Sequence, residues 1–316
     1  MRAFLQAIGR HGFSFLSLPG VVSMGMGIKI TRNTYTGIPS LVLGVKKKLP
    51  LRDIPKDQVI PRHIDNLLTD VIQVGRIKML GYALPSPQEP PEDQPRTKRV
   101  RPAQPGVSIG HYKVSAGTFG AVVRGNFPGG IAILGNNHIL ANSTDGHDGR
   151  SRIGDPVLQP GPYDNGTASD IIARLQSFSP IIPENKGGQR QLNTIDAAIA
   201  VPVEQGLVNN TILGLGPVRG TAPAYPGTPV FKSGRSSGVT RGSVTTVGTT
   251  IRVENDDQMY IFADQIGTTA PSEAGDSGSL FINQYGRAVG LLFAGSENQS
   301  FANPINPVLK YFRVSL

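Results

Sequence analysis

Short apolar runs broken by glycine, proline and asparagine follow one another along most of the chain. In the N-terminal part, residues 20–30 and 40–45 predict two strands joined by a polar turn, and residues 70–79 predict another strand. Residues 55–70 predict a short helix or two turns. This part of the chain is therefore expected to form a small α+β unit.

A change of pattern near residue 83 divides the chain. Residues 83–105 carry seven prolines and charges of both signs, a composition that cannot bury a core and is typical of a linker. After the linker, short strands recur to the C-terminus. The sequence thus predicts a basic α+β domain at 1–82, a proline-rich linker at 83–105 and a mainly β domain at 106–316.

The composition supports this division and excludes some classes of site. Thirty-nine glycines and twenty-six prolines in 316 residues favour strands and turns over helices. The chain has no cysteine, which excludes disulfides and thiolate metal sites and fits a reducing, cytoplasmic location. Arg10 and His11 interrupt the first apolar residues, so no signal peptide and no membrane span are predicted.

The positive charge is concentrated near the N-terminus. The formal net charge is +9, and residues 1–105 hold sixteen Lys and Arg against seven Asp and Glu, whereas the remainder is balanced at fifteen of each. A basic segment can attract an acidic partner, nucleic acid or anionic lipid. The lysines at 46–48 are more typical of a solvated strand end than of a binding patch.

The strongest candidate for chemistry is the stretch 271–281. Ser277 lies between Gly275 and Gly278, ahead of an apolar run, and glycine permits the tight turn that would leave a nucleophilic hydroxyl exposed. The backbone N–H groups of Gly275 and Ser277 would then face a carbonyl oxygen that becomes negative in the transition state. The same Gly-Asp-Ser-Gly is also ordinary turn chemistry.

A nucleophilic serine needs a base that accepts its proton, and the candidates lie upstream in the sequence. Residues 115–124 and 131–134 predict a pair of strands, and His138 follows directly, where the chain would hold an imidazole rigidly with one face open. His147 lies instead in a polar turn and is expected to face water. The acidic residues of that turn match no calcium-loop spacing.

Two carboxylates could orient this base. Asp170 and Asp196 each begin an alternating strand, and hydrophobic periodicity alone does not choose between them.

These motifs together carry a family resemblance. Asn-Asn-His-Ile-Leu-Ala at 136–141, Asn-x-x-Asp at 193–196 and Gly-Asp-Ser-Gly-Ser at 275–279 occur in the order His, Asp, Ser. That order and those contexts resemble the trypsin-like (chymotrypsin-fold) serine peptidases. Residues 227–244 resemble the opening hairpin of the C-terminal barrel of that family, and residues 289–295 resemble its pocket-lining strand.

A narrower resemblance is also present. Asn-Asn-His-Ile-Leu-Ala-Asn, Gly-Asp-Pro-Val-Leu-Gln-Pro-Gly and Gly-Leu-Leu-Phe-Ala-Gly are similar to a bacterial branch related to the plant Narrow Leaf type of trypsin-like protein. The likeness covers residues 106–316 well and the N-terminal unit less specifically.

The resemblance implies a mainly β fold, with two six-stranded β-barrels of chymotrypsin type after a small α+β domain. It also implies a serine endopeptidase that acts on protein or peptide substrates through an acyl-enzyme. His138 is then the base, Asp196 rather than Asp170 orients it, and Ser277 is the nucleophile. The oxyanion hole comes from the backbone of Gly275 and Ser277. No cofactor and no metal are implied.

The substrate pocket departs from trypsin. Pro271 stands six residues before Ser277, where the family sets its preference, and Ser272, Phe293 and Gly295 are the other pocket residues by analogy. An apolar or small side chain is therefore expected there. No Ile-Val-Gly-Gly sequence follows a basic cleavage point, so a new N-terminus is not expected to pair with Asp276. Asp276 is expected to accept hydrogen bonds within its own loop.

Two further functions remain as alternatives. One is a catalytically silent barrel that binds peptides or a partner without cutting them, and the other is a basic N-terminal adaptor regulated by the peptidase. A peptidase in the cytoplasm must also be restrained, so a homo-oligomer or a closed resting site is a further hypothesis.

Overall fold

The computed structural model describes every residue except 33, 82–95 and 115. Its helices are α1 (Arg2–Leu16), α2 (Asn137–Leu140) and α3 (Ile305–Phe312). The strands of the N-terminal part are β1 (Val21–Thr31), β2 (Thr34–Val45), β3 (His63–Ile64), β4 (Leu67–Gln73) and β5 (Lys78–Met79). Those of the middle part are β6 (Ser108–His111), β7 (Gly117–Thr118), β8 (Ala121–Arg124), β9 (Ile131–Gly135), β10 (Pro156–Leu158), β11 (Ile171–Phe178), β12 (Ala198–Pro202), β13 (Thr211–Ile212) and β14 (Gly216–Pro217). The last strands are β15 (Pro229–Gly234), β16 (Gly238–Asn255), β17 (Gln258–Thr268), β18 (Leu280–Asn283), β19 (Ala288–Gly295) and β20 (Ser300–Pro304). The predicted mainly β fold is confirmed.

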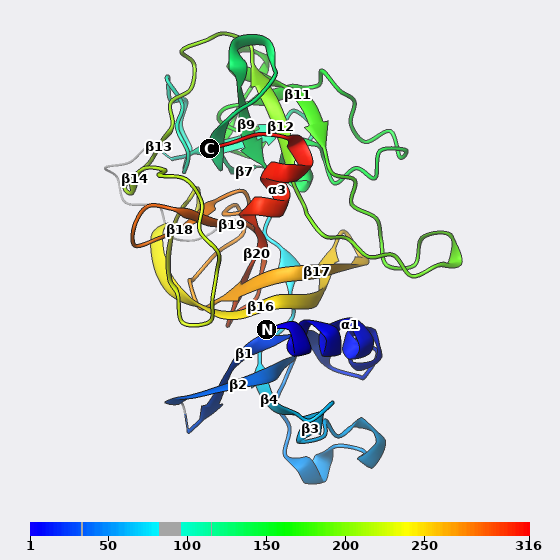
Figure 1. Cartoon of the computed structure of the whole chain (residues 1–316). Coiled ribbons are helices and arrows are strands. Elements are labelled where there is room, and N and C mark those ends of the chain that lie inside the picture. Colours follow the sequence, from blue (N-terminus) through cyan, green and yellow to red (C-terminus); the bar gives the residue numbers. More distant parts are fainter. Residues whose placement is uncertain (33, 82–95, 115) are drawn as a thin grey trace.

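The first barrel is the upper part of the molecule in Figure 1. Its strands have the order β7-β6-β10-β11-β12-β9-β8. Only Phe119 and Gly120 separate β7 from β8, and both continue the ladder, because the Phe119 N–H donates to Val107 O and the Gly120 N–H donates to Leu134 O. The two ends of this sheet are thus one broken strand, which closes the sheet around an apolar core.

The second barrel lies below the first (Figure 1). Its strands follow the order β15-β18-β19-β20-β17-β16, and a further pairing of β15 with β16 closes the ring. The interface between the barrels is one apolar cluster that contains Leu134 of the first barrel, Leu291 of the second and Leu309 of α3. Because this cluster is buried, the loops at the edge of the interface are held at fixed relative positions.

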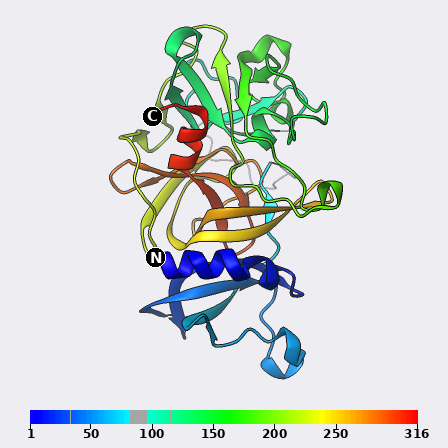
Figure 2. The same ribbon diagram turned by 45° about the vertical axis from the view of Figure 1, so that its right-hand side comes forward.

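The N-terminal part extends the sheet of the second barrel. Strand β1 pairs antiparallel with β16 and with β2, which confirms the strands predicted at 20–30 and 40–45, and β4 pairs parallel with β2. Helix α1, which the hydrophobic pattern did not indicate, lies across β1 and β16 (Figure 2). It buries Ala7 and Ile8 against Met24 and Leu41.

The prediction of one strand at 70–79 is wrong. Strand β4 ends at Gln73, and Gly75 turns the chain with φ +92°, a conformation that favours glycine. After this turn the chain no longer pairs with β2, and the short strand β5 pairs with β16 and β19 of the second barrel. The chain therefore crosses from the N-terminal sheet to the barrel at this turn.

Most of the predicted linker, residues 82–95, lies outside the described residues. The remaining part is packed: the Arg96 guanidinium donates to Gly106 O at 3.0 Å and to Ser233 Oγ at 2.8 Å, and Ala103 is fully buried. The division into domains at 1–82, 83–105 and 106–316 stays a prediction. No helix in the described part of the chain is long and apolar enough to cross a membrane.

Candidate active site

The antiparallel pairing of β9 with β12 brings two of the predicted residues together. Gly135 at the end of β9 faces Ala198 at the start of β12. His138, in α2, follows β9 directly, and Asp196 precedes β12, so both lie at the same edge of the first barrel. Ser277 comes from the second barrel, in the turn before β18.

His138 and Asp196 form a buried pair. Asp196 Oδ2 accepts a short hydrogen bond from His138 Nδ1, and Oδ1 accepts the backbone N–H of His138 at 3.2 Å. The Asp196 backbone is fixed in turn, because its N–H donates to Asn303 Oδ1 at 2.9 Å and its carbonyl accepts from Asn136 Nδ2 at 2.7 Å. His138 Nε2 is buried and has no hydrogen-bond partner among the described residues.

The two alternative candidates, Asp170 and His147, make other contacts. Asp170 forms a capping box with Thr167 and an ion pair with Arg99 at 3.1 Å. His147 is exposed in its turn, where its backbone N–H donates to Asp145 Oδ1 at 2.7 Å. The structure thus places Asp196, and not Asp170, beside His138.

The turn that carries Ser277 is held by the first barrel. Gly275 has φ +97°, and its carbonyl accepts Thr118 Oγ1 at 2.8 Å. The Thr118 N–H donates to Ser277 O at 2.7 Å. Ser277 is fully buried, and its Oγ donates to Phe293 O at 3.1 Å rather than to His138. In this arrangement the hydroxyl is therefore not hydrogen-bonded to the imidazole of His138.

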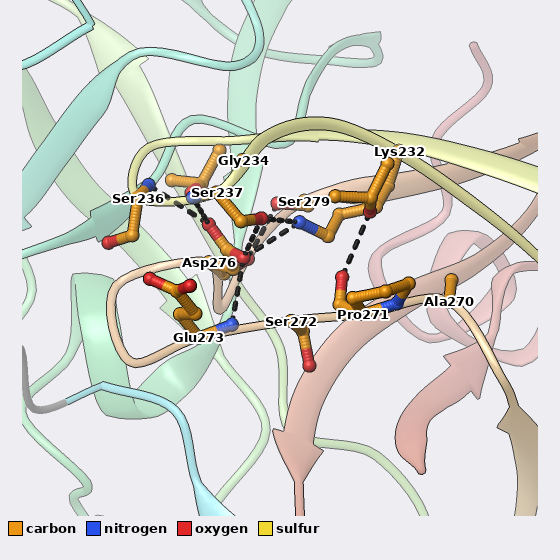
Figure 3. Close-up of polar contacts among 12 residues, drawn as sticks. Lys232, Gly234, Ser236, Ser237, Ala270, Pro271, Ser272, Glu273, Asp276 and Ser279 are labelled. Carbon is orange, nitrogen blue, oxygen red and sulfur yellow. Dashed lines mark hydrogen bonds and ion pairs between the residues drawn. The ribbon is translucent and has the colours of Figure 1, made fainter. Parts of the chain in front are cut away.

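Asp276 is the centre of a buried polar cluster (Figure 3). Its side chain and that of Lys232 are both fully buried, and Lys232 Nζ lies 2.7 Å from Asp276 Oδ2. Backbone N–H groups of Ser236 and Ser237 donate to Oδ1 at 2.9 and 3.1 Å, and that of Glu273 donates to Oδ2 at 3.0 Å. Of these donors only Glu273 belongs to the loop of Asp276, so the expected bonds within that loop are a minor part of the cluster.

The electrostatics of this cluster keep the carboxyl charged. Burial by itself raises the pKa of Asp276, but the charge and hydrogen bond of Lys232, with the bonds from Ser237 and Glu273, outweigh it, and the pKa lies below its ordinary value. Burial lowers the pKa of Lys232, and Asp276 opposes that shift. Lys232 thus ties the turn that carries Ser277 to strand β15.

Sequence reasoning missed Lys232. The only signal for it is a single cation inside the short strand 229–234, and such a residue is usually assigned to a solvated strand face. Thr118, Asn136 and Asn303 were also missed as residues that hold the site, because nothing in the local pattern shows which backbone groups they meet.

Replacing Lys232 with Met is expected to lower the free energy of unfolding by about 3–5 kcal/mol, because Asp276 would then be a buried charge without its cation. The measurement is urea unfolding in a Ser277→Ala background, with Lys310→Met as the control at an exposed lysine of α3. A double variant, Lys232→Met with Asp276→Asn, should recover much of the loss. Equal midpoints for Lys232→Met and Lys310→Met would contradict the role given to the pair.

The predicted pocket residues are only partly brought together. A Cβ built on Gly295 would lie 3.0 Å from Ser272 Oγ, so these two residues adjoin. The Phe293 ring instead packs against the Phe262 ring, with 4.8 Å between the centroids and an angle of 53° between the planes, and the Phe293 carbonyl accepts the Ser277 hydroxyl. Pro271 is exposed, and its carbonyl accepts Thr240 Oγ1 at 2.9 Å.

Comparisons with solved structures find bacterial serine proteases. Protease A of Thermobifida fusca is 20% identical over 68% of this chain and 98% of that chain, with a TM-score of 0.49. The chymotrypsin of Cellulomonas bogoriensis is 20% identical over 67% and 96%, with a TM-score of 0.47. The Nocardiopsis protease NAPase is 19% identical over 68% and 99%, with a TM-score of 0.49. Searches of protein-family models and of curated protein sequences gave no match. Likeness at this level assigns no chemistry, which has to rest on the side chains.

Proposed function

We propose that the chain is a serine endopeptidase in which His138, Asp196 and Ser277 form the catalytic triad. The observation that carries the proposal is the buried His138–Asp196 pair, whose remaining ring nitrogen has no partner among the described residues. Leaving a buried ring nitrogen without a hydrogen bond costs free energy in the resting protein. The cost is understandable if this nitrogen is the base that accepts the serine proton.

The reaction follows from these positions. The Ser277 hydroxyl turns away from Phe293 O, gives its proton to His138 Nε2 and attacks a peptide carbonyl carbon. Asp196 holds the Nδ1–H tautomer and stabilises the imidazolium. His138 then protonates the leaving amine, an ester to Ser277 Oγ remains, and water hydrolyses it with His138 as base.

Two backbone groups of the glycine turn are proposed as the oxyanion hole. Gly275, which has a positive φ, and Ser277 would each supply one N–H. Buried Asp276, which connects them, is fixed by Lys232. A preorganised pair of donors of this kind stabilises the tetrahedral intermediate by several kcal/mol.

Finer expectations rest on sequence alone. The relation to the plant Narrow Leaf type is carried by three short motifs. A homo-oligomer, an acidic partner for the basic N-terminal part and a cytoplasmic location also stay predictions.

The test is labelling with a fluorophosphonate, which reacts with a serine that an assembled triad activates. A Leu80→Asp variant, whose cleft should be open because Leu80 packs over Gly295, is expected to take one label at Ser277. The wild-type chain, in which Ser277 is fully buried, is expected to take the label much more slowly. The Ser277→Ala variants should take none. If neither chain is labelled and neither hydrolyses a peptide, the proposed function fails.

A further inference from the structure

The cleft beside Ser277 contains a segment of the chain itself, residues 77–81, which leads out of the N-terminal part. Strand β5 lies antiparallel to the end of β19, with Met79 opposite Ala294 and Lys78 opposite Gly295. On its other side, Ile77 O accepts the N–H of Glu254 at 2.9 Å. A strand added to a sheet edge in this way is a common mode of peptide recognition.

The backbone of Leu80 is held from both ends. Its N–H donates to Phe293 O at 3.2 Å, and its carbonyl oxygen accepts the N–H of Gly275 at 2.5 Å. Gly275 is the residue that the sequence singled out as an oxyanion donor. The carbonyl that receives this donor is the one on which negative charge would develop during attack.

The side chain of Leu80 lies beside Gly295, one of the predicted pocket residues. It is only 8% exposed and belongs to the apolar core of the second barrel, with Val230, Val244 and Leu292. A Cβ on Gly295 would lie 3.1 and 3.3 Å from its two terminal methyl groups. The space beside Gly295 therefore accepts a branched apolar side chain of this length.

The next residue, Gly81, lies against the proposed base. A Cβ built on Gly81 would be 2.5 Å from His138 Cδ2 and 3.0 Å from His138 Nε2, so a side chain has no room there. Gly275 and His138 thus lie at the two ends of one peptide unit, the bond between Leu80 and Gly81. A cavity of about 60 Å³ beside Gly81 and His138 has room for a water molecule.

From these contacts we infer that the chain is its own substrate and hydrolyses the Leu80–Gly81 bond. The inference rests on the proposed function and adds a substrate to it: a peptide with leucine before the scissile bond and glycine after it. Ser277 Oγ bonds to the Leu80 carbonyl carbon, and its proton passes through His138 to the nitrogen of Gly81 as the C–N bond breaks. Water then releases Leu80 as a carboxylate, and the chain becomes fragments 1–80 and 81–316.

The arrangement also explains the burial of the site. Ser277 is fully buried and His138 is 4% exposed, values that would exclude a substrate from solution. Because Val74 O is held by Ser296 Oγ at 2.6 Å, the new terminus at Leu80 would stay close to the cleft after cleavage. The fragments are therefore expected to remain associated until a competing substrate or a disturbance of the N-terminal sheet displaces residues 77–80.

The first experiment is mass spectrometry of the full chain under denaturing conditions. Wild type should yield fragments that end at Leu80 and begin at Gly81, and Ser277→Ala should stay intact. The rate should not depend on protein concentration, because the bond is presented within one molecule. Wild type that stays intact, or cleavage at another bond, overturns the inference.

Matched variants test the two contacts that select this bond. Leu80→Asp should slow cleavage at least about 100-fold, because the apolar pocket rejects a carboxylate, whereas Leu51→Asp, at a leucine 74% exposed, should be cut like wild type. Gly81→Ala should slow cleavage for lack of room at His138. Gly9→Ala, where a Cβ meets nothing within 4 Å, is its control.

A peptide given in trans separates the two proposals. Leu80→Asp should hydrolyse the p-nitroanilide of Ile-Lys-Met-Leu, the sequence of residues 77–80, at least about 100-fold faster than the same peptide ending in lysine. If wild type stays intact while Leu80→Asp takes the fluorophosphonate and cuts this peptide, the self-cleavage is wrong and the peptidase stands. If no chain is labelled or active, the proposed function has failed as well.

Discussion

Replacing Ser277 with alanine is expected to lower the turnover of a peptide substrate by about 10⁶. The loss is this large because the proposed acyl-enzyme cannot form, and the remaining groups then act only by binding and by polarising the carbonyl. The rate is measured with the leucine p-nitroanilide in the Leu80→Asp background, where residues 77–80 should not compete for the cleft.

The control is the neighbouring hydroxyl. Ser279 lies in the same turn, is fully buried and donates to Asp276 O at 2.6 Å. Ser279→Ala removes one hydrogen bond, about 1 kcal/mol, and should reduce turnover by no more than about tenfold. Comparable losses in the two variants would mean that Ser277 matters for the shape of the turn and not as the nucleophile.

The second large effect is expected at Asp196. Asparagine in its place can keep the packing, but its amide lets the imidazole take the wrong tautomer, and the turnover should fall by about 10⁴. Asp196→Asn should take the fluorophosphonate label correspondingly slowly. The measurement is the rate of p-nitroaniline release together with the rate of labelling.

Asp170 is the matched control for the substitution at Asp196. It begins a similar alternating strand, but its side chain caps a turn and pairs with Arg99. Asp170→Asn should therefore cost stability, on the order of 1 kcal/mol for a lost cap, and leave turnover nearly unchanged. A greater loss of turnover at Asp170 than at Asp196 would contradict the assignment of the triad.

Several parts of the site could be read from sequence because they depend on local contexts. A histidine directly after the strand 131–134 and a serine between Gly275 and Gly278 are recognisable without neighbours, since turn chemistry is local. The choice between Asp170 and Asp196 was not local, and only the family resemblance favoured Asp196 before the pairing of β9 with β12 placed it by His138.

Other parts could not be read because they join segments far apart in the chain. Lys232 and Asp276 are separated by 44 residues, and burying that pair requires the whole second barrel. The break after β4 was missed for a similar reason: an apolar run at 70–79 fits one strand, but β5 finds its partners in β16 and β19.

The turn at 275–278 separates what the sequence predicts locally from what the tertiary structure decides. By itself the sequence determined a mainly β chain and the order of histidine, aspartate and serine. Only the tertiary structure decided which carboxylate meets His138, which cation fixes Asp276, and that Leu80 and Gly81 lie across the cleft. Hydrophobic periodicity and turn residues depend on neighbours that are close in sequence. The contacts at this turn instead form only when the two barrels and the N-terminal sheet pack together.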